Sequence, residues 1–192
     1  RSMPETRSGQ MLAVAVAKLK ICADSVQKFT IDDRGEREQP QKEGDKKAMA
    51  KLPFDVLFRS GRFDLEYGSD DEIKQDRAVF IVKFQPQPAS LQLKEEEGED
   101  GRYNKAMNWL TGEMAIDTET GEVVEFKAHL AATVTYGWKR FPLAELQTLN
   151  LSFQQHFDGT RWRPATANLE IQYWAFGTGT THERYVPHFV PC

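Results

Sequence analysis

Apolar and polar side chains alternate with a period of two along much of this chain, most clearly in its second half. Successive side chains of a β-strand point to opposite faces of a sheet, so this period predicts strands with one buried face. The segments that show it best are "RFDLEYG" (62–68) and "ANLEIQYW" (167–174), and "RAVFIVKFQPQP" (77–88) is a further clear strand that Pro86 and Pro88 end. Turn-forming residues separate the segments, and we expect at least seven strands in an antiparallel sheet that has one face on a core.

The stretch "MAIDTETGEVVEF" (114–126) gathers carboxylates, threonines and a glycine, which fits either a calcium loop or a sharp reversal of the backbone. A calcium-binding EF-hand loop requires glycine at its sixth position and glutamate at its twelfth. Counted from Asp117, Gly121 is at the fifth position and Ala128 at the twelfth. The apolar positions on both sides step in twos, so we predict a β-hairpin in which Asp117 bonds the backbone ahead of it.

A second hairpin is predicted around the turn "DGT", between "NLSFQQHF" and "RWRPATANLEIQYWAF". Proline lacks a backbone N–H, so in a sheet it belongs on an edge, at a strand start or at a bulge. We therefore expect Trp162 to pack inward and Pro164 to interrupt the ladder of hydrogen bonds. Further along the strand, Tyr173 lies on one side and Trp174 and Phe176 on the other. One aromatic set must face something other than the main core, such as a lid helix, a partner or an apolar ligand.

The first third of the chain has a different composition. Residues 9–29 ("GQMLAVAVAKLKICADSVQKF") are rich in alanine and lysine, which favours a helix. Residues 33–48 form a charged stretch with glycine and proline, which predicts an exposed loop, and residues 1–10 have the character of a disordered or tag-derived end. We expect a single domain over residues 1–192, because this length is enough to enclose one core.

Charge and composition exclude some classes of protein. The net charge is −4 and the basic residues are scattered among acids, which argues against a nucleic-acid surface. The longest apolar run, "MLAVAVA", is too short to span a bilayer. It lacks the basic region and cleavage site of a signal peptide, so we assume that any export signal has been removed upstream. The two cysteines, Cys22 and Cys192, fit either a disulfide or two free thiols.

The search for catalytic motifs yields nothing specific. The sequence has no nucleophile elbow, zinc-protease helix, dinucleotide fingerprint or phosphate-binding loop. The histidines lack the spacing of metal ligands; they are His129, His156, His182 and His188. The 29 acidic residues offer many combinations for a glycosidase-like pair, and the sequence favours none of them. We therefore predict no enzyme activity, no catalytic residues, no metal and no cofactor.

Three short motifs occur in an order that is found in a known family. They are Phe84 with Pro86 at the end of one strand, Gly112 to Asp117 ("GEMAID") in the next, and Trp162 with Pro164 in a late strand. In these motifs residues 50–190 resemble the bacterial LolA/LolB-like proteins, a periplasmic group that carries and sorts outer-membrane lipoproteins. The resemblance implies a mainly β (α+β) fold. A single strongly curved antiparallel sheet would form an unclosed barrel, with one or two helices covering its concave face.

Carriers of that kind hold acyl chains without catalysis. The resemblance therefore implies a non-enzymatic cell-envelope module that binds an apolar ligand, which would be an acyl chain, a lipid or a lipidated protein. We expect it in the periplasm or outside the cell, peripheral to the envelope, with no transmembrane segment and no nucleic-acid partner. The hydrophobic cavity would be formed by apolar rows of the concave face: Phe80, Val82, Val124, Phe126, Leu130, Leu169, Ile171 and Tyr173.

Two other interpretations stay open. One is an interaction or structural domain whose core is filled by its own side chains. The other is a carboxylate-based hydrolase at the mouth of the sheet, which two or more inward-facing carboxylates on one strand would favour. Ligand that copurifies with the protein would distinguish a binding module from a self-filled domain.

Overall fold

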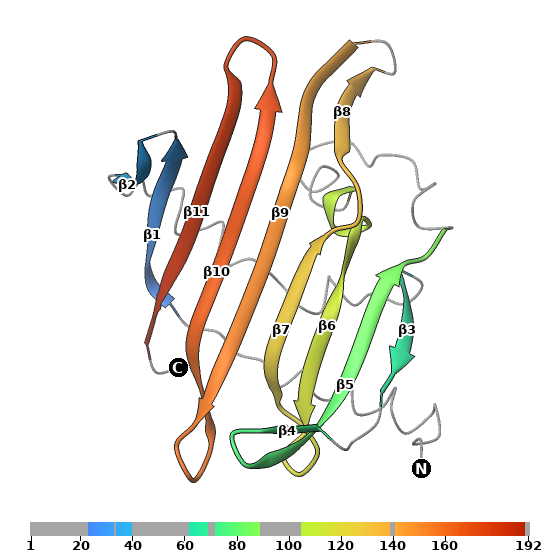
Figure 1. Ribbon diagram of the computed structural model, residues 1–192, viewed down its shortest axis with the longest axis vertical. Helices are drawn as coiled ribbons and strands as arrows, with labels where there is room; N and C mark the ends of the chain where they lie inside the picture. Colours follow the sequence, from blue (N-terminus) through green and yellow to red (C-terminus); the bar gives the residue numbers. More distant parts are fainter. Residues whose placement is uncertain are drawn as a thin grey trace.

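The structure is a computed structural model, and it describes residues 23–32, 34–39, 62–68, 72–88, 105–138 and 141–190. These residues form one antiparallel β-sheet of eleven strands (Figure 1). The strands are β1 (Ala23–Asp32), β2 (Gly35–Gln39), β3 (Phe63–Tyr67), β4 (Glu72–Lys74), β5 (Arg77–Pro86), β6 (Leu110–Asp117), β7 (Val123–Leu130), β8 (Val134–Trp138), β9 (Phe141–Phe157), β10 (Trp162–Ala175) and β11 (Gly179–Phe189).

The order of strands across the sheet is β2-β1-β11-β10-β9-β7-β6-β5-β3, with β4 beside β5 and β8 beside β9. Most neighbours are close in sequence, as hairpin connections require. The main exception is the pair of β1 and β11, which joins the first and last strands. Among the described residues no pairing joins β2 to β3, so the sheet is not closed into a barrel. The predicted fold class, a single unclosed antiparallel sheet, is confirmed.

Helical geometry in the described part of the chain is limited to residues 105–107, so the expected covering helices are not shown there. The helix predicted over 9–29 is wrong for residues 23–29, which belong to β1. Alanine and lysine favour a helix only weakly, and pairing with β11 on one side and β2 on the other overrides that preference. Residues 1–22, with the predicted end at 1–10, lie outside the described residues. No helix among the described residues is long and apolar enough to cross a membrane.

The charged stretch predicted as a loop over 33–48 contains strand β2, so the prediction is wrong there. The Asp32 carboxylate accepts the backbone N–H of Arg34 at 2.9 Å, and Gly35 adopts a φ of +101°, which together reverse the chain. The strand is exposed, as predicted for this charged stretch. Charged side chains suit the edge of a sheet because they discourage pairing with other chains. Residues 40–48 lie outside the described residues.

The main core lies on one face of β3, β5, β6, β7 and β9. Its buried side chains are Phe63, Phe80, Val82, Phe84, Leu110, Met114, Ile116, Val123, Phe126, Ala128, Leu151 and Phe153. Phe84 is at the centre of this cluster, with its ring centroid 5.7 Å from that of Phe126 and 5.1 Å from that of Phe63. A smaller cluster packs separately: Val79, Ile81, Ala115, Val124 and Trp162. The alternation along β5 places these two clusters on opposite faces of the sheet.

The hairpin predicted at 114–126 is confirmed, with β6 and β7 as its arms. The Asp117 carboxylate accepts the backbone N–H groups of Glu119 at 2.9 Å and Thr120 at 2.7 Å. Gly121 adopts a φ of +67° and donates its N–H to the Asp117 carbonyl oxygen at 2.8 Å. Backbone donors of the turn therefore occupy this carboxylate, as the hairpin interpretation requires.

The second hairpin, formed by β9 and β10, is confirmed as well. Trp162 is 5 % exposed and its ring centroid lies 5.2 Å from that of Phe157. The register of the two strands shifts between Pro164 and Thr166, so the proline interrupts the ladder as expected.

Candidate functional site

The predicted ligand-binding residues differ in their burial. Phe80, Val82 and Phe126 are at most 1 % exposed and belong to the main core. A ligand reaches such side chains only by displacing the residues that pack on them. These three side chains therefore lie beneath the surface that a ligand would contact, and they do not line a binding site.

The apolar face continues from this core onto β9 and β10, where it is only half-buried. Ile171 lies opposite Leu149 in register, and Leu169 is on the same face. A register shift further along brings Tyr173 opposite Leu146 and keeps apolar residues together. Four half-buried side chains form what we call the β9–β10 row: Leu149, Leu169, Ile171 and Tyr173.

Segments that are distant in sequence pack against the two ends of the β9–β10 row. At one end Leu169 packs against the main core, and at the other end Ile171 and Tyr173 pack against a third cluster. The buried members of that cluster are Ala106, Val134 and Leu146. Leu130 is half-buried and touches both clusters. Sequence reasoning missed Leu149 and the third cluster, although the alternation along "LQTLNLSF" was a signal for Leu149.

The structure places Val124 on the face opposite to that of Phe126, against the prediction. Ala115 of β6 pairs with Glu125, but the next residue, Ile116, pairs with Val123. One extra residue in β7 is thus accommodated as a β-bulge, which moves the following side chains to the other face. Val123 therefore joins the main core, and Val124 packs in the smaller cluster.

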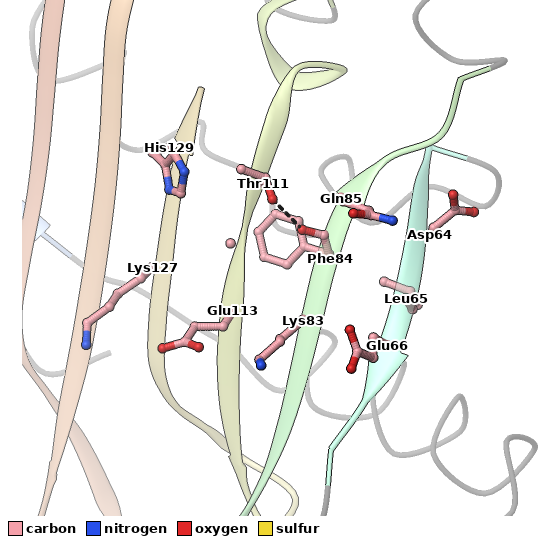
Figure 2. A pocket seen from close by; sticks show the side chains of 11 residues that line it. Asp64, Leu65, Glu66, Lys83, Phe84, Gln85, Thr111, Glu113, Lys127 and His129 are labelled. Carbon is pink, nitrogen blue, oxygen red and sulfur yellow. Dashed lines mark hydrogen bonds between the residues drawn. The ribbon is translucent and has the colours of Figure 1, made fainter. Parts of the chain in front are cut away.

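The face opposite to the main core carries a polar groove of about 520 Å³ over β3, β5, β6 and β7 (Figure 2). Charges alternate across these strands in one row of register partners: Glu66, Lys83, Glu113 and Lys127. Figure 2 shows these side chains beside a second polar row: Asp64, Gln85, Thr111 and His129. Opposite charges on adjacent strands stabilise a sheet by about 0.2–1 kcal/mol for each pair. The groove therefore has the composition of a solvated sheet face.

The charges around the groove influence one another. The hydrogen bond to Glu125 raises the pKa of Lys127, and the charges of Glu125 and Glu113 raise it further against the effect of burial. Burial alone would raise the pKa of Glu125, but hydrogen bonds from Lys127 and Lys74 lower it. Lys127 is therefore protonated and Glu125 ionised near neutral pH, which fits a fixed ion pair. In the described part of the chain, no group of three His, Cys, Asp or Glu residues could hold a metal ion.

Gly112 allows the backbones of β6 and β7 to approach closely at this groove. A Cβ atom at Gly112 would lie 2.0 Å from the carbonyl oxygen of Lys127 and 2.8 Å from the Cα of Ala128. Beside it, the Thr111 hydroxyl donates to the carbonyl oxygen of Phe84 at 3.0 Å. The hydrogen bond thus joins β6 to β5, and the missing side chain of Gly112 lets β7 approach β6 closely.

No protein-family model, no curated protein and no solved structure matches this chain. The resemblance to LolA/LolB-like proteins therefore depends on its three short motifs, and what it implies stays a prediction.

Proposed function

We propose that this chain is a non-enzymatic binding module of the cell envelope that holds an apolar ligand against the β9–β10 row. The ligand would be an acyl chain, a lipid or a lipidated protein, and the location periplasmic or secreted. One observation carries the proposal: a half-buried apolar row continues a fully buried core on the same face of an unclosed sheet. Removing apolar surface from water contributes about 25 cal/mol per Å², so such a row favours an apolar ligand.

The geometry of the row suits an extended ligand. Leu169, Ile171 and Tyr173 occupy every second position of β10, which spaces them about 6.6–6.8 Å apart. An acyl chain that lies along the strand would contact all three side chains. A hollow of about 400 Å³ lies between β7 and β9, where Leu130 and Leu149 line it together with polar residues of both strands.

Binding of a fluorescent fatty-acid analogue to the delipidated protein tests the proposal. Ile171→Glu places a carboxylate in the row, and Gln172→Glu adds the same group at the next residue, which lies on the opposite face. We expect micromolar binding by the unmodified chain and at least about tenfold weaker binding by Ile171→Glu, because a desolvated charge is costly. Gln172→Glu should bind as the unmodified chain does. Thermal unfolding of both variants shows whether they remain folded.

An absence of binding by the unmodified chain, or an equal loss in both variants, would contradict the proposal. The alternative would then take its place, namely an interaction or structural domain whose core is filled by its own side chains. Mass spectrometry of an organic extract of the purified protein gives an independent answer, because a binding module should release an apolar compound and a self-filled domain should not.

A further inference from the structure

One end of the long strands exposes two large apolar side chains. Leu143, near the start of β9, is 56 % exposed, and Phe176, directly after β10, is 76 % exposed. The backbone N–H of Phe176 donates to the carbonyl oxygen of Leu143 at 2.9 Å, so the two residues are neighbours across the strands. Figure 1 shows this end at the top, where β9 begins and β10 turns into β11.

This end, which we call the apolar tip, consists of residues 142–144 and 175–181, and none of these residues is charged. The other end of the same strands is different. Asp158 and Arg163 form an ion pair at the β9–β10 turn, and Glu119 lies in the β6–β7 turn with its side chain 80 % exposed. Figure 1 shows both turns at the bottom. The turns at the two ends of β10 thus differ, because the β10–β11 turn carries no charged residue and the β9–β10 turn carries an ion pair.

The backbone of the apolar tip is compatible with a non-aqueous environment. The N–H of Thr178 donates to the carbonyl oxygen of Ala175 at 3.2 Å, and its hydroxyl bonds the same oxygen at 3.4 Å. Gly177 and Gly179 adopt φ values of +85° and +79°, which close the turn without side chains. Backbone polar groups that enter a lipid layer must be bonded within the protein, and the N–H groups of Phe176 and Thr178 are bonded in this way.

We infer that the apolar tip is a membrane-docking site that places Leu143 and Phe176 in the interfacial region of a lipid bilayer. Exposed apolar side chains with no charge among them partition into that region. A second copy of this chain fits less well, because a stable protein interface takes about 800 Å² and 20–30 residues from each partner. The apolar tip supplies only two short segments and two large exposed side chains.

The position of the apolar tip also connects it with the proposed ligand site. The β9–β10 row runs along β10 from Leu169 through Tyr173, and Ala175 then lies opposite Ala144 at the tip. Docking at this end would therefore bring the β9–β10 row to the membrane surface. An apolar ligand would then pass between the bilayer and the row along the face of β10 that carries the row. This use of the tip rests on the proposed function, whereas membrane docking itself does not.

Co-sedimentation of the full chain with uncharged phosphatidylcholine vesicles tests the inference. The double variant Leu143→Ser/Phe176→Ser removes both exposed side chains of the tip. Ile73→Ser is the matched control, because Ile73 is 73 % exposed but belongs to β4, near the other end of the long strands (Figure 1). We expect the unmodified chain to bind, the double variant to bind at least about tenfold more weakly, and Ile73→Ser to bind normally. Added salt should have little effect, because the phosphatidylcholine vesicles carry no net charge.

Three results would overturn the inference: no binding by the unmodified chain, full binding by the double variant, or an equal loss in Ile73→Ser. A dimer in sedimentation velocity that the double variant loses would assign the tip to a second copy instead. The Ile171→Glu variant separates the two proposals. Vesicle binding that persists when fatty-acid binding is lost supports the tip as a site of its own, and joint loss of both would overturn it.

Discussion

The indole N–H of Trp162 donates a hydrogen bond to the carboxylate of Asp117, with 3.0 Å between Nε1 and Oδ2. Trp162 begins β10 and Asp117 ends β6, so the bond ties the two hairpins together. Arg77 of β5 pairs with the same carboxylate, and its guanidinium carbon lies 4.3 Å from the ring centroid of Phe157. Asp117 is completely buried, so its charge depends on these partners.

Asp117→Asn should therefore lower the free energy of unfolding by about 3–5 kcal/mol, because it leaves Arg77 without its buried partner. Urea unfolding followed by circular dichroism measures the loss. Glu119→Gln is the matched control, since Glu119 also pairs with Arg77 but has a side chain that is 80 % exposed. That variant should lose no more than about 1 kcal/mol. Similar small losses in both variants would show that the Asp117 pair is not an anchor of the fold.

Trp162→Phe keeps an aromatic ring in the smaller cluster but removes the indole N–H. We expect a loss of about 1.5–3 kcal/mol, as is usual for a hydrogen bond to a charged group. The loss should be smaller in the Asp117→Asn background, because residues that share one bond are energetically coupled. A double-mutant cycle from denaturant unfolding measures this coupling, and strictly additive losses would refute it.

The stability of the protein should decrease in acid. Burial alone would raise the pKa of the Asp117 carboxyl, but hydrogen bonds from Arg77, the Thr120 backbone and Trp162 lower it from 3.8 to about 2. A group with a lowered pKa in the folded state contributes stability above its unfolded pKa and loses that contribution as the pH falls toward its folded pKa.

The window for Asp117 is therefore from about pH 4 down to about pH 2. Unfolding free energies measured by denaturant titration across this window should fall, and they should fall less steeply in Asp117→Asn. Other carboxylates titrate in both proteins, so the difference between the two curves isolates Asp117. Parallel curves would mean that this carboxyl has an ordinary pKa.

Gly112→Ala should separate β6 from β7. The added Cβ would lie 2.0 Å from the Lys127 carbonyl oxygen, and backbone atoms of a central strand cannot move aside as a flexible side chain can. Overpacking of this kind costs about 1–3 kcal/mol, and thermal unfolding measures it. Thr111→Ala, one residue away, loses only the hydrogen bond to Phe84 and should cost about 0.5–1.5 kcal/mol. A variant at Gly112 that is as stable as the unmodified chain would disprove the close approach.

Calcium should leave the melting temperature unchanged. A site present only in the folded state would raise that temperature by mass action. The Asp117 carboxylate is instead bonded to Glu119, Thr120, Arg77 and Trp162. An increase of several degrees with calcium, absent in Asp117→Asn, would contradict the hairpin interpretation.

Local patterns were sufficient to predict the central strands and both confirmed hairpins. The alternation of side chains in β3 and β10 comes from the geometry of a single strand and needs no partner to be visible. The two turns have the same local origin: Asp117 and Asp158 each accept backbone N–H groups two and three residues ahead.

Strands β1 and β2 were not predictable in this way. The alanine and lysine before Phe29 favour a helix, and the charges of Gly35–Gln39 favour a loop. These residues become strands because β11, from the other end of the chain, pairs with β1. A pattern within one segment cannot reveal a partner that is more than a hundred residues away.

The candidate site likewise contains positions that local patterns predicted and positions that they did not. Ile171 and Tyr173 share a face as their spacing predicted, whereas Val124 does not share the face of Phe126, because a bulge interrupts the period. Phe126 is completely buried and Ile171 only half-buried, although both occupy apolar positions of alternating strands. The alternation within one regular strand was enough to predict which side chains point to the same face. Strand order, bulges and the apolar positions left half-exposed were decided by the tertiary structure, because they depend on contacts between residues far apart in the chain.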